Sequence, residues 1–214
     1  MGKKLLVLFV ILLVLISLNS CIGVSMDIQM RRDGSGRLNL EYRISNIAEN
    51  LGRLDGNEMW RTIPVGRADW ERTVVRLDGI RLVSFSSNER QAETVTRVTL
   101  EFDNPAALIN FLNANGNKTS FDNNTLSLIL LERSPLINPD LLELAALLSG
   151  DYSFAVSFSA DRNSTMTITD GAGNEIPPPR KTQIVPQGRK TSFSIDMTEL
   201  LSLTGGLGVR FTAH

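Results

Sequence analysis

The chain has 214 residues, of which 42% are hydrophobic and 21% are charged, and its formal net charge is −1. A charge so close to zero gives no electrostatic reason to bind nucleic acid. Cys21 is the only cysteine and His214, the last residue, is the only histidine. The chain therefore has no second thiol for a disulfide and too few cysteine and histidine ligands for a structural zinc site.

The first 20 residues have the layout of a secretory signal peptide. Lys3 and Lys4 give a basic start, a 14-residue apolar run covers 5–18, and the small Ser20 precedes Cys21. A helix of that length would rise about 21 Å, which is short of a hydrocarbon core of about 30 Å. A permanent transmembrane anchor, and an ordinary cleaved signal that leaves Cys21 as a free thiol, remain as alternatives.

The sequence Leu18-Asn19-Ser20-Cys21 resembles a bacterial lipoprotein lipobox. The resemblance implies that Cys21 is lipidated, by palmitate or a similar acyl chain, and becomes the first mature residue. Two or more acyl chains are enough for stable membrane anchoring. Ile22 follows, where some bacteria with two membranes carry an Asp that retains the protein at the inner membrane. The expected location is the cell envelope, at the outer membrane or the outer face of the inner membrane.

Alternation of apolar and polar residues predicts a series of half-buried strands after the anchor. The first two flank Asp33-Gly34-Ser35-Gly36, which is suited to a tight hairpin loop. The strand at 152–158 is the most aromatic, and 166–168 is its expected partner. The unbroken apolar run 128–131 predicts a central strand. The predicted strands are 24–30, 38–44, 80–86, 93–102, 119–122, 126–132, 152–158, 166–168, 191–195 and 209–212.

Helices are predicted between these strands. Asn104-Pro105 and Asn138-Pro139 each combine a capping residue with a proline suited to the first helical position. Asp196 followed by Glu199 gives a pattern similar to a capping box. The segment 47–60 is either a short helix or an ordered loop, because Gly52 and Gly56 weaken a helix. The other predicted helices are 68–77, 104–115, 138–149 and 197–203.

Together these elements predict a single α+β domain over residues 21–214, preceded by the signal peptide at 1–20. Its expected core is an antiparallel sheet built from successive hairpins, with three to four helices packed on it. No long flexible linker divides the chain.

Nothing in the sequence indicates catalysis. The only thiol is expected to be acylated, the only histidine is terminal, and a Gly-x-Ser-x-Gly elbow is absent. A pair of catalytic carboxylates, as in a glycosidase, stays an alternative, because two such residues can lie far apart in the sequence. The segment 170–175 is either a calcium loop or a plain turn. Arg180-Lys181 and Arg189-Lys190 form either a solvated loop or a contact for lipid headgroups and anionic wall polymers. We therefore predict no enzyme activity, no catalytic residues, no resident metal and no cofactor.

Residues 21–45 resemble the start of LppM-type lipoproteins. They combine the lipobox cysteine, an alternating strand, an Asp-Gly-x-Gly turn and a second alternating strand, and 151–196 repeats this arrangement loosely. The resemblance implies an α+β domain at the cell envelope, with a lipid or another apolar molecule as the ligand. It carries no site residues.

Two functions are therefore kept open. The first is a binding module, in which Tyr152, Phe154, Val156 and Phe158 face the leucines of 139–149 across an apolar cavity. The same residues would equally build an ordinary core. The second is a structural or interaction lipoprotein that presents a protein-binding surface to an envelope partner. In both cases the membrane is a partner through acylated Cys21, and nucleic acid is not.

Overall fold

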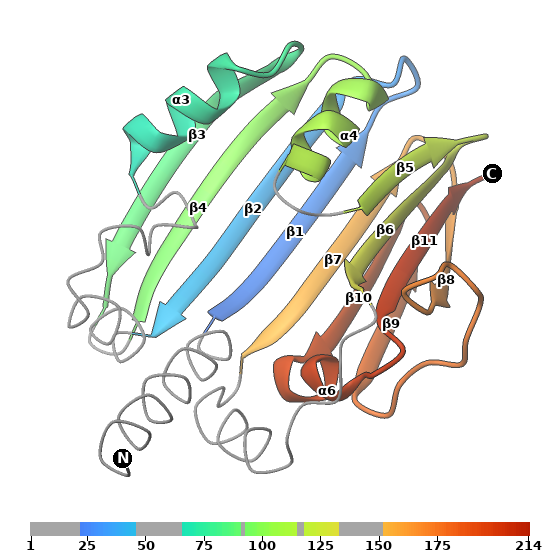
Figure 1. Ribbon diagram of the computed structural model, residues 1–214. Coiled ribbons are helices and arrows are strands. Elements are labelled where there is room, and N and C mark those ends of the chain that lie inside the picture. The colour runs from blue at the N-terminus through green and yellow to red at the C-terminus, as the bar shows by residue number, and fades with distance from the viewer. Residues whose placement is uncertain (1–21, 46–65, 91–92, 115–117, 133–151) are drawn as a thin grey trace, which may run out of the picture.

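The computed structural model describes residues 22–45, 66–90, 93–114, 118–132 and 152–214 (Figure 1). Strands hold 57% of these residues and helices 17%. The strands are β1 Ile22–Met30, β2 Gly36–Ser45, β3 Ile80–Glu89, β4 Glu93–Phe102, β5 Lys118–Asp122, β6 Thr125–Leu131, β7 Ser153–Ala160, β8 Ser164–Thr169, β9 Thr182–Gln187, β10 Lys190–Asp196 and β11 Leu207–Ala213. The helices are α3 Arg67–Val75, α4 Pro105–Ala114 and α6 Met197–Ser202.

The strands form two sheets. The larger has seven strands in the order β3-β4-β2-β1-β7-β10-β9, and the smaller has four in the order β5-β6-β11-β8. All neighbours are antiparallel except β1 and β7, which pair in parallel from Val24 opposite Phe154 to Met30 opposite Ala160. This pairing joins segments about 130 residues apart and makes the larger sheet mixed.

The predicted α+β architecture, an antiparallel sheet covered by three to four helices, is wrong. The described residues are mostly strand, and the inner face of the larger sheet is covered by the smaller sheet as well as by α3 and α4 (Figure 1). The alternating strand segments on either side of each turn sequence indicate which neighbouring strands pair as hairpins. It does not show that β5 and β6 leave the first sheet, because a strand buried on one face has the same alternation in either sheet.

Several local predictions are confirmed. The hairpins β1–β2, β3–β4 and β5–β6 all form. Asn123 and Asn124 have positive φ at the β5–β6 turn. The carboxamide oxygen of Asn104 accepts a hydrogen bond from the backbone N–H of Ala107 at 2.9 Å, so Asn104 caps α4 as expected. The predicted segments 47–60 and 138–149 lie outside the described residues.

Other local predictions are wrong. The strand at 166–168 lies in β8, which pairs with β11 in the smaller sheet and not with β7. The edge strand β9 was not predicted, because its sequence contains Pro186 and lacks clean alternation. Asp196 lies at the N-cap of α6, but its side chain makes no capping hydrogen bond.

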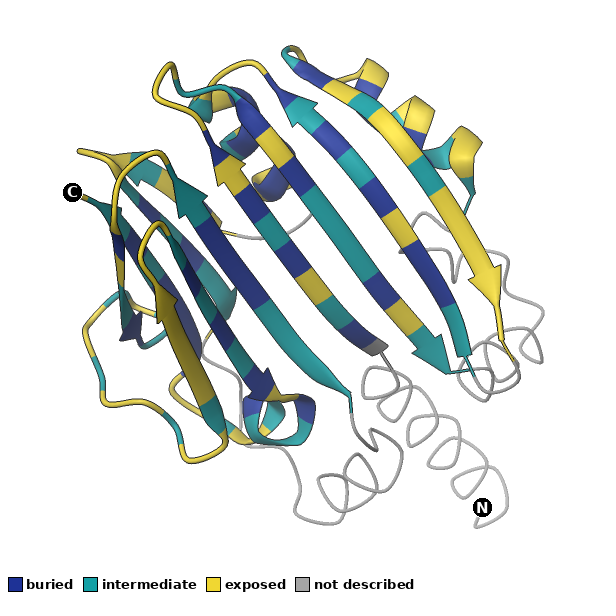
Figure 2. Ribbon diagram, turned by 180° about the vertical axis from the view of Figure 1, so that it is seen from behind, coloured by how far each residue is buried: buried dark blue, intermediate teal, exposed yellow. Residues whose placement is uncertain are grey.

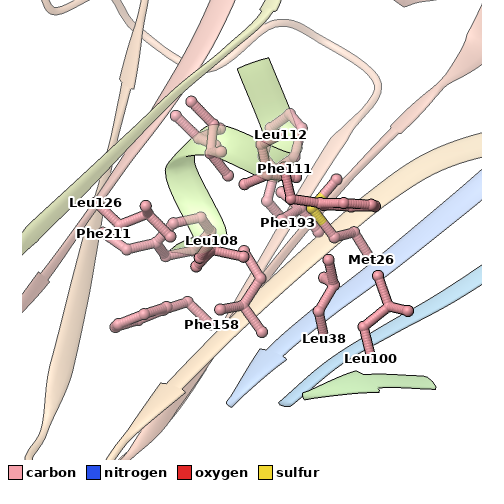
Figure 3. Packing of buried hydrophobic residues seen from close by; sticks show 14 of the residues in the cluster. Met26, Leu38, Leu100, Leu108, Phe111, Leu112, Leu126, Phe158, Phe193 and Phe211 are labelled. Atoms are coloured by element: carbon pink, nitrogen blue, oxygen red, sulfur yellow. The ribbon is translucent and has the colours of Figure 1, made fainter. Parts of the chain in front are cut away.

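The core lies between the two sheets and beneath the helices. In β1 the even-numbered residues face inward and the odd-numbered residues face outward, and Figure 2 shows this alternation across the larger sheet from its open side. Figure 3 shows residues from both sheets and from α4 packed together. The rings of Phe158 on β7 and Phe211 on β11 join the sheets, with centroids 5.6 Å apart.

Candidate functional site

Cys21, the predicted lipidation site, lies outside the described residues. The adjacent residue, Ile22, already belongs to β1. β1 has nine residues, which at about 3.3 Å each span about 30 Å. Met30 at the far end of β1 therefore lies about 30 Å from the point where the predicted anchor joins the sheet.

A pocket lies between the two sheets at that far end. Its volume is about 280 Å³, and the turns β1–β2, β5–β6 and β7–β8 surround it. We call it the inter-sheet pocket. Its apolar wall consists of Met30, Phe121, Phe158, Ala160 and Ala213. Phe158 is fully buried, whereas Phe121, Ala160 and Ala213 are half-buried, so the wall connects the core to the pocket mouth.

Five charged residues from two turns line the same pocket: Arg31, Arg32, Asp33, Asp161 and Arg162. All five are exposed. An apolar wall beside a charged rim is the usual composition of a small-molecule site.

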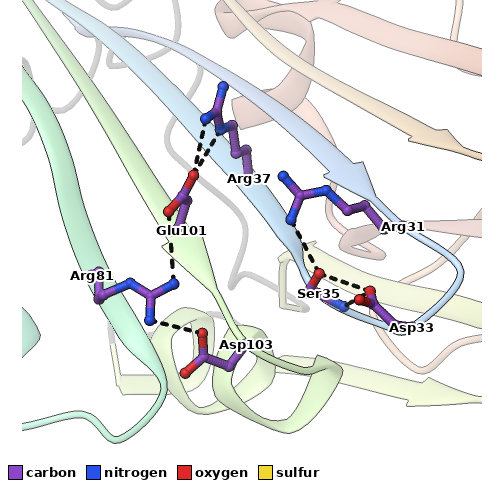
Figure 4. A network of polar contacts seen from close by, with 7 residues as sticks. All are labelled: Arg31, Asp33, Ser35, Arg37, Arg81, Glu101 and Asp103. Carbon is purple, nitrogen blue, oxygen red and sulfur yellow. Dashed lines mark hydrogen bonds and ion pairs between the residues drawn. The ribbon is translucent and has the colours of Figure 1, made fainter.

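Each rim carboxylate already has a partner. The Asp33 carboxylate accepts hydrogen bonds from the backbone N–H of Ser35 at 2.9 Å and from its hydroxyl at 2.7 Å, and these bonds lower the pKa of Asp33 (Figure 4). Asp161 accepts the backbone N–H of Arg32 at 3.3 Å, and the Arg32 guanidinium lies 3.8 Å away.

The aromatic strand contributes only partly to this pocket. Phe158 lines it, whereas Val156 is buried in the core and Phe154 packs at its margin. Tyr152 lies at the opposite end of β7 and lines another hollow. The leucines of 139–149 lie outside the described residues, so the predicted cavity between them and β7 stays a prediction.

The outer face of the larger sheet is polar and crossed by ion pairs. Glu41 lies between Arg43 at 3.0 Å and Arg97 at 2.7 Å. Arg37 bonds Glu101 at 3.0 Å (Figure 4). Because the arginines are exposed and the two glutamates only half-buried, these ion pairs contribute little to stability. A hollow of about 530 Å³ opens on this face near the start of β1, lined by residues that include Gly23, Arg43 and Tyr152.

Asp27 on β1 connects four strands on this face, because Asn39 of β2 also donates to it, at 3.4 Å. It accepts hydrogen bonds from Ser157 and Gln29, and Lys190 lies 2.9 Å from its carboxylate. Burial by itself would raise the pKa of Asp27, but the bonds from Ser157, Lys190 and Gln29 outweigh burial and hold the pKa below its ordinary value of 3.8. A lowered pKa stabilises the fold above pH 3.8, and that contribution is lost as the pH falls through the lowered pKa.

Replacing Asp27 with Asn is expected to lower the free energy of unfolding at neutral pH by about 1.5 kcal/mol, because charge-assisted hydrogen bonds are lost. It should also flatten the loss of stability on acidification below pH 4. Urea unfolding at several pH values measures both effects. Asp78→Asn, which removes an exposed carboxylate, is the matched control. Equal acid sensitivity in wild type and Asp27→Asn would contradict the assignment.

The segment 170–175 forms a closed turn. The carboxylate of Asp170 accepts the backbone N–H groups of Ala172 at 2.9 Å and Asn174 at 2.8 Å, and the Asn174 side-chain amide at 3.0 Å. These bonds, led by that from the Asn174 side chain, lower the pKa of Asp170. The geometry is that of the plain turn which the sequence also allowed. Within the described ranges, no three Asp, Glu, His or Cys residues are grouped to hold a metal ion.

The four basic residues near the proline-rich loop are not one cluster. The β9–β10 register places Lys181 and Lys190 at opposite ends of the hairpin. Lys181 pairs with Asp196 at 3.5 Å and Lys190 with Asp27 at 2.9 Å. The residues that sequence reasoning missed are Arg31, Arg32 and Arg162, which the parallel β1–β7 pairing brings to one pocket.

In the part of the chain that the structure covers, no helix is long and apolar enough to cross a bilayer. No family model matches the chain, and no curated protein matches it. Among solved structures, the folded domain of the Mycobacterium tuberculosis LppM protein, determined by NMR, matches with 14% identity. The match covers 82% of this chain and 90% of that one, with a TM-score of 0.36.

LppM is also the kind of lipoprotein that the sequence of residues 21–45 resembles.

Proposed function

We propose that the protein is a non-catalytic bacterial lipoprotein, anchored in the cell envelope through Cys21, that binds a lipid or another apolar ligand in the inter-sheet pocket. The observation that carries the proposal is the apolar wall of that pocket. Met30, Phe121, Phe158, Ala160 and Ala213 converge there from β1, β5, β7 and β11. Contact with a hydrocarbon chain would remove the exposed parts of the half-buried Phe121, Ala160 and Ala213 from water, which is favourable at about 25 cal/mol per Å² of buried apolar surface.

The size of the pocket limits the ligand. A volume of about 280 Å³ lies just below the range for small-molecule sites, about 300–1,000 Å³. The pocket therefore suits one short acyl or alkyl chain, and the rest of a larger lipid would stay outside.

Two substitutions on β7 test the site. Ala160 lines the inter-sheet pocket, and Ala155 lines the hollow on the outer face. Ala160→Phe is expected to fill the pocket and reduce labelling by a photoreactive decanol at least fivefold, whereas Ala155→Phe should not change it. The full mature chain would be labelled in phosphatidylcholine nanodiscs, and the modified peptides mapped by mass spectrometry. Matching melting temperatures would show that both variants fold.

Labelling spread over the surface, or unchanged in Ala160→Phe, would contradict the proposal. Labelling that is lost in Ala155→Phe and kept in Ala160→Phe would move the site to the hollow of about 530 Å³ on the outer face.

A structural or interaction lipoprotein is the second candidate, and one observation favours it. The outer face of the larger sheet is polar along β1 and β2, and a hollow of about 530 Å³ opens on it near the start of β1. A partner protein close to the membrane could contact this face. Crosslinking in intact cells that gives one dominant protein adduct through this face would support it, and adducts confined to the inter-sheet pocket would oppose it.

A further inference from the structure

The rim of the inter-sheet pocket carries two arginines that form no ion pair within the described residues. Arg162 has no hydrogen bond through its side chain there, and the Arg31 guanidinium donates to the hydroxyl of Ser35, at 3.2 Å. That hydroxyl in turn donates to the carboxylate of Asp33, and the positive charge of Arg31 contributes to the lowered pKa of Asp33 (Figure 4). Asp161 is engaged by Arg32. Arg31 thus reaches a carboxylate only through Ser35, and Arg162 contacts none in the described part of the chain.

This arrangement has two chemically different halves. Arg31 follows Met30, the last residue of β1, and Arg162 lies two residues beyond Ala160, the last residue of β7. Because β1 and β7 are parallel neighbours with Met30 opposite Ala160, the two turns leave the sheet side by side. Met30, Phe158 and Ala160 of the apolar wall therefore lie on the same two strands that lead into the turns with Arg31 and Arg162, and all five residues line one pocket.

We propose that the inter-sheet pocket selects a single-chain amphiphile that ends in a carboxylate or a phosphate, with its chain on the apolar wall and its anionic end at Arg31 and Arg162. This inference rests on the proposed function and adds the class of ligand. Guanidinium groups suit both anions, because their planar donors match two oxygens at once.

The rim lies at the opposite end of β1 from Ile22, the residue that follows the predicted lipidation site in the sequence.

Protection against photolabelling tests the inference. In the full mature chain in phosphatidylcholine nanodiscs, decanoate and decyl phosphate are expected to protect the pocket peptides at concentrations about fivefold to tenfold lower than decanol does. The double variant Arg31→Gln/Arg162→Gln should abolish this preference and leave protection by decanol unchanged. Arg76→Gln, an exposed arginine at the end of α3, should behave as wild type. Comparing decanoate with decyl phosphate shows which anion is preferred.

The possible failures are distinct. Equal protection by decanol and decanoate in wild type would overturn the anionic preference and leave the proposed function standing. A preference that survives in the double variant would overturn the roles of Arg31 and Arg162. Absence of protection by all three compounds, together with absence of specific labelling, would overturn both the inference and the proposed function. Acetate is the control for a bare anion, and protection by acetate equal to that by decanoate would also overturn the inference.

Discussion

Replacing Phe158 with alanine is expected to lower the free energy of unfolding by about 3 to 5 kcal/mol. Phe158 is fully buried on β7, and its ring meets that of Phe211 across the two sheets, with the centroids 5.6 Å apart. Truncation would leave a cavity at the junction of the sheets, where rigid strands on both sides cannot collapse to fill it. Chemical unfolding monitored by circular dichroism measures the change.

Phe85→Ala is the control for loss of a phenyl ring. Phe85 lies on the edge strand β3 and is only half-buried, so a loss below about 2 kcal/mol is expected. Equal losses for Phe158→Ala and Phe85→Ala would show that the two sheets do not share the core described in Figure 3.

Replacing Cys21 with alanine is expected to abolish acylation and release the protein from the membrane fraction. The physical reason is that Cys21 is the only thiol in the chain, and a lipobox lipoprotein receives its acyl chains on that sulfur. Metabolic labelling with a palmitate analogue, followed by membrane fractionation, measures both effects.

Ser25→Ala, an exposed position further along β1, is the control and should keep both the label and the membrane location. A wild-type protein without label would contradict lipidation at Cys21. A labelled Cys21→Ala variant would show that another residue carries the acyl chain.

Local features of the fold could be predicted from the sequence because their causes are local. Asp33-Gly34 makes the β1–β2 turn with Gly34 at positive φ, and Asn104 caps α4 through a bond three residues away. Strand alternation likewise depends on the nearest neighbours of each residue. These signals predicted the hairpins β1–β2, β3–β4 and β5–β6 and all three described helices, with small errors at their ends.

The long-range arrangement could not be predicted in this way. The parallel pairing of β1 with β7 depends on packing between segments more than 120 residues apart, and no residue pattern specifies it. The place of β8 in the smaller sheet also depends on long-range packing. The alternation of Met166 and Ile168 would fit a strand beside β7 equally well. The α+β prediction was wrong for this reason.

The candidate site depends on the same long-range pairing. Arg31 and Arg162 are ordinary turn residues in the sequence, and only the β1–β7 register places them at one pocket. Phe158 was predicted as a cavity wall, but its expected partners were the leucines of 139–149. Those leucines lie outside the described residues, and within them the ring of Phe158 packs against Phe211 and lines the inter-sheet pocket.

Native mass spectrometry of the full mature protein, released from detergent in the gas phase, tests ligand binding in the inter-sheet pocket most directly. The account predicts a bound single-chain compound in wild type and Ala155→Phe that leaves on collisional activation, whereas covalent acyl chains stay. Ala160→Phe should lack this compound. A wild-type protein that carries no such compound, even after incubation with decanoate, or an Ala160→Phe variant that retains it, would contradict the account.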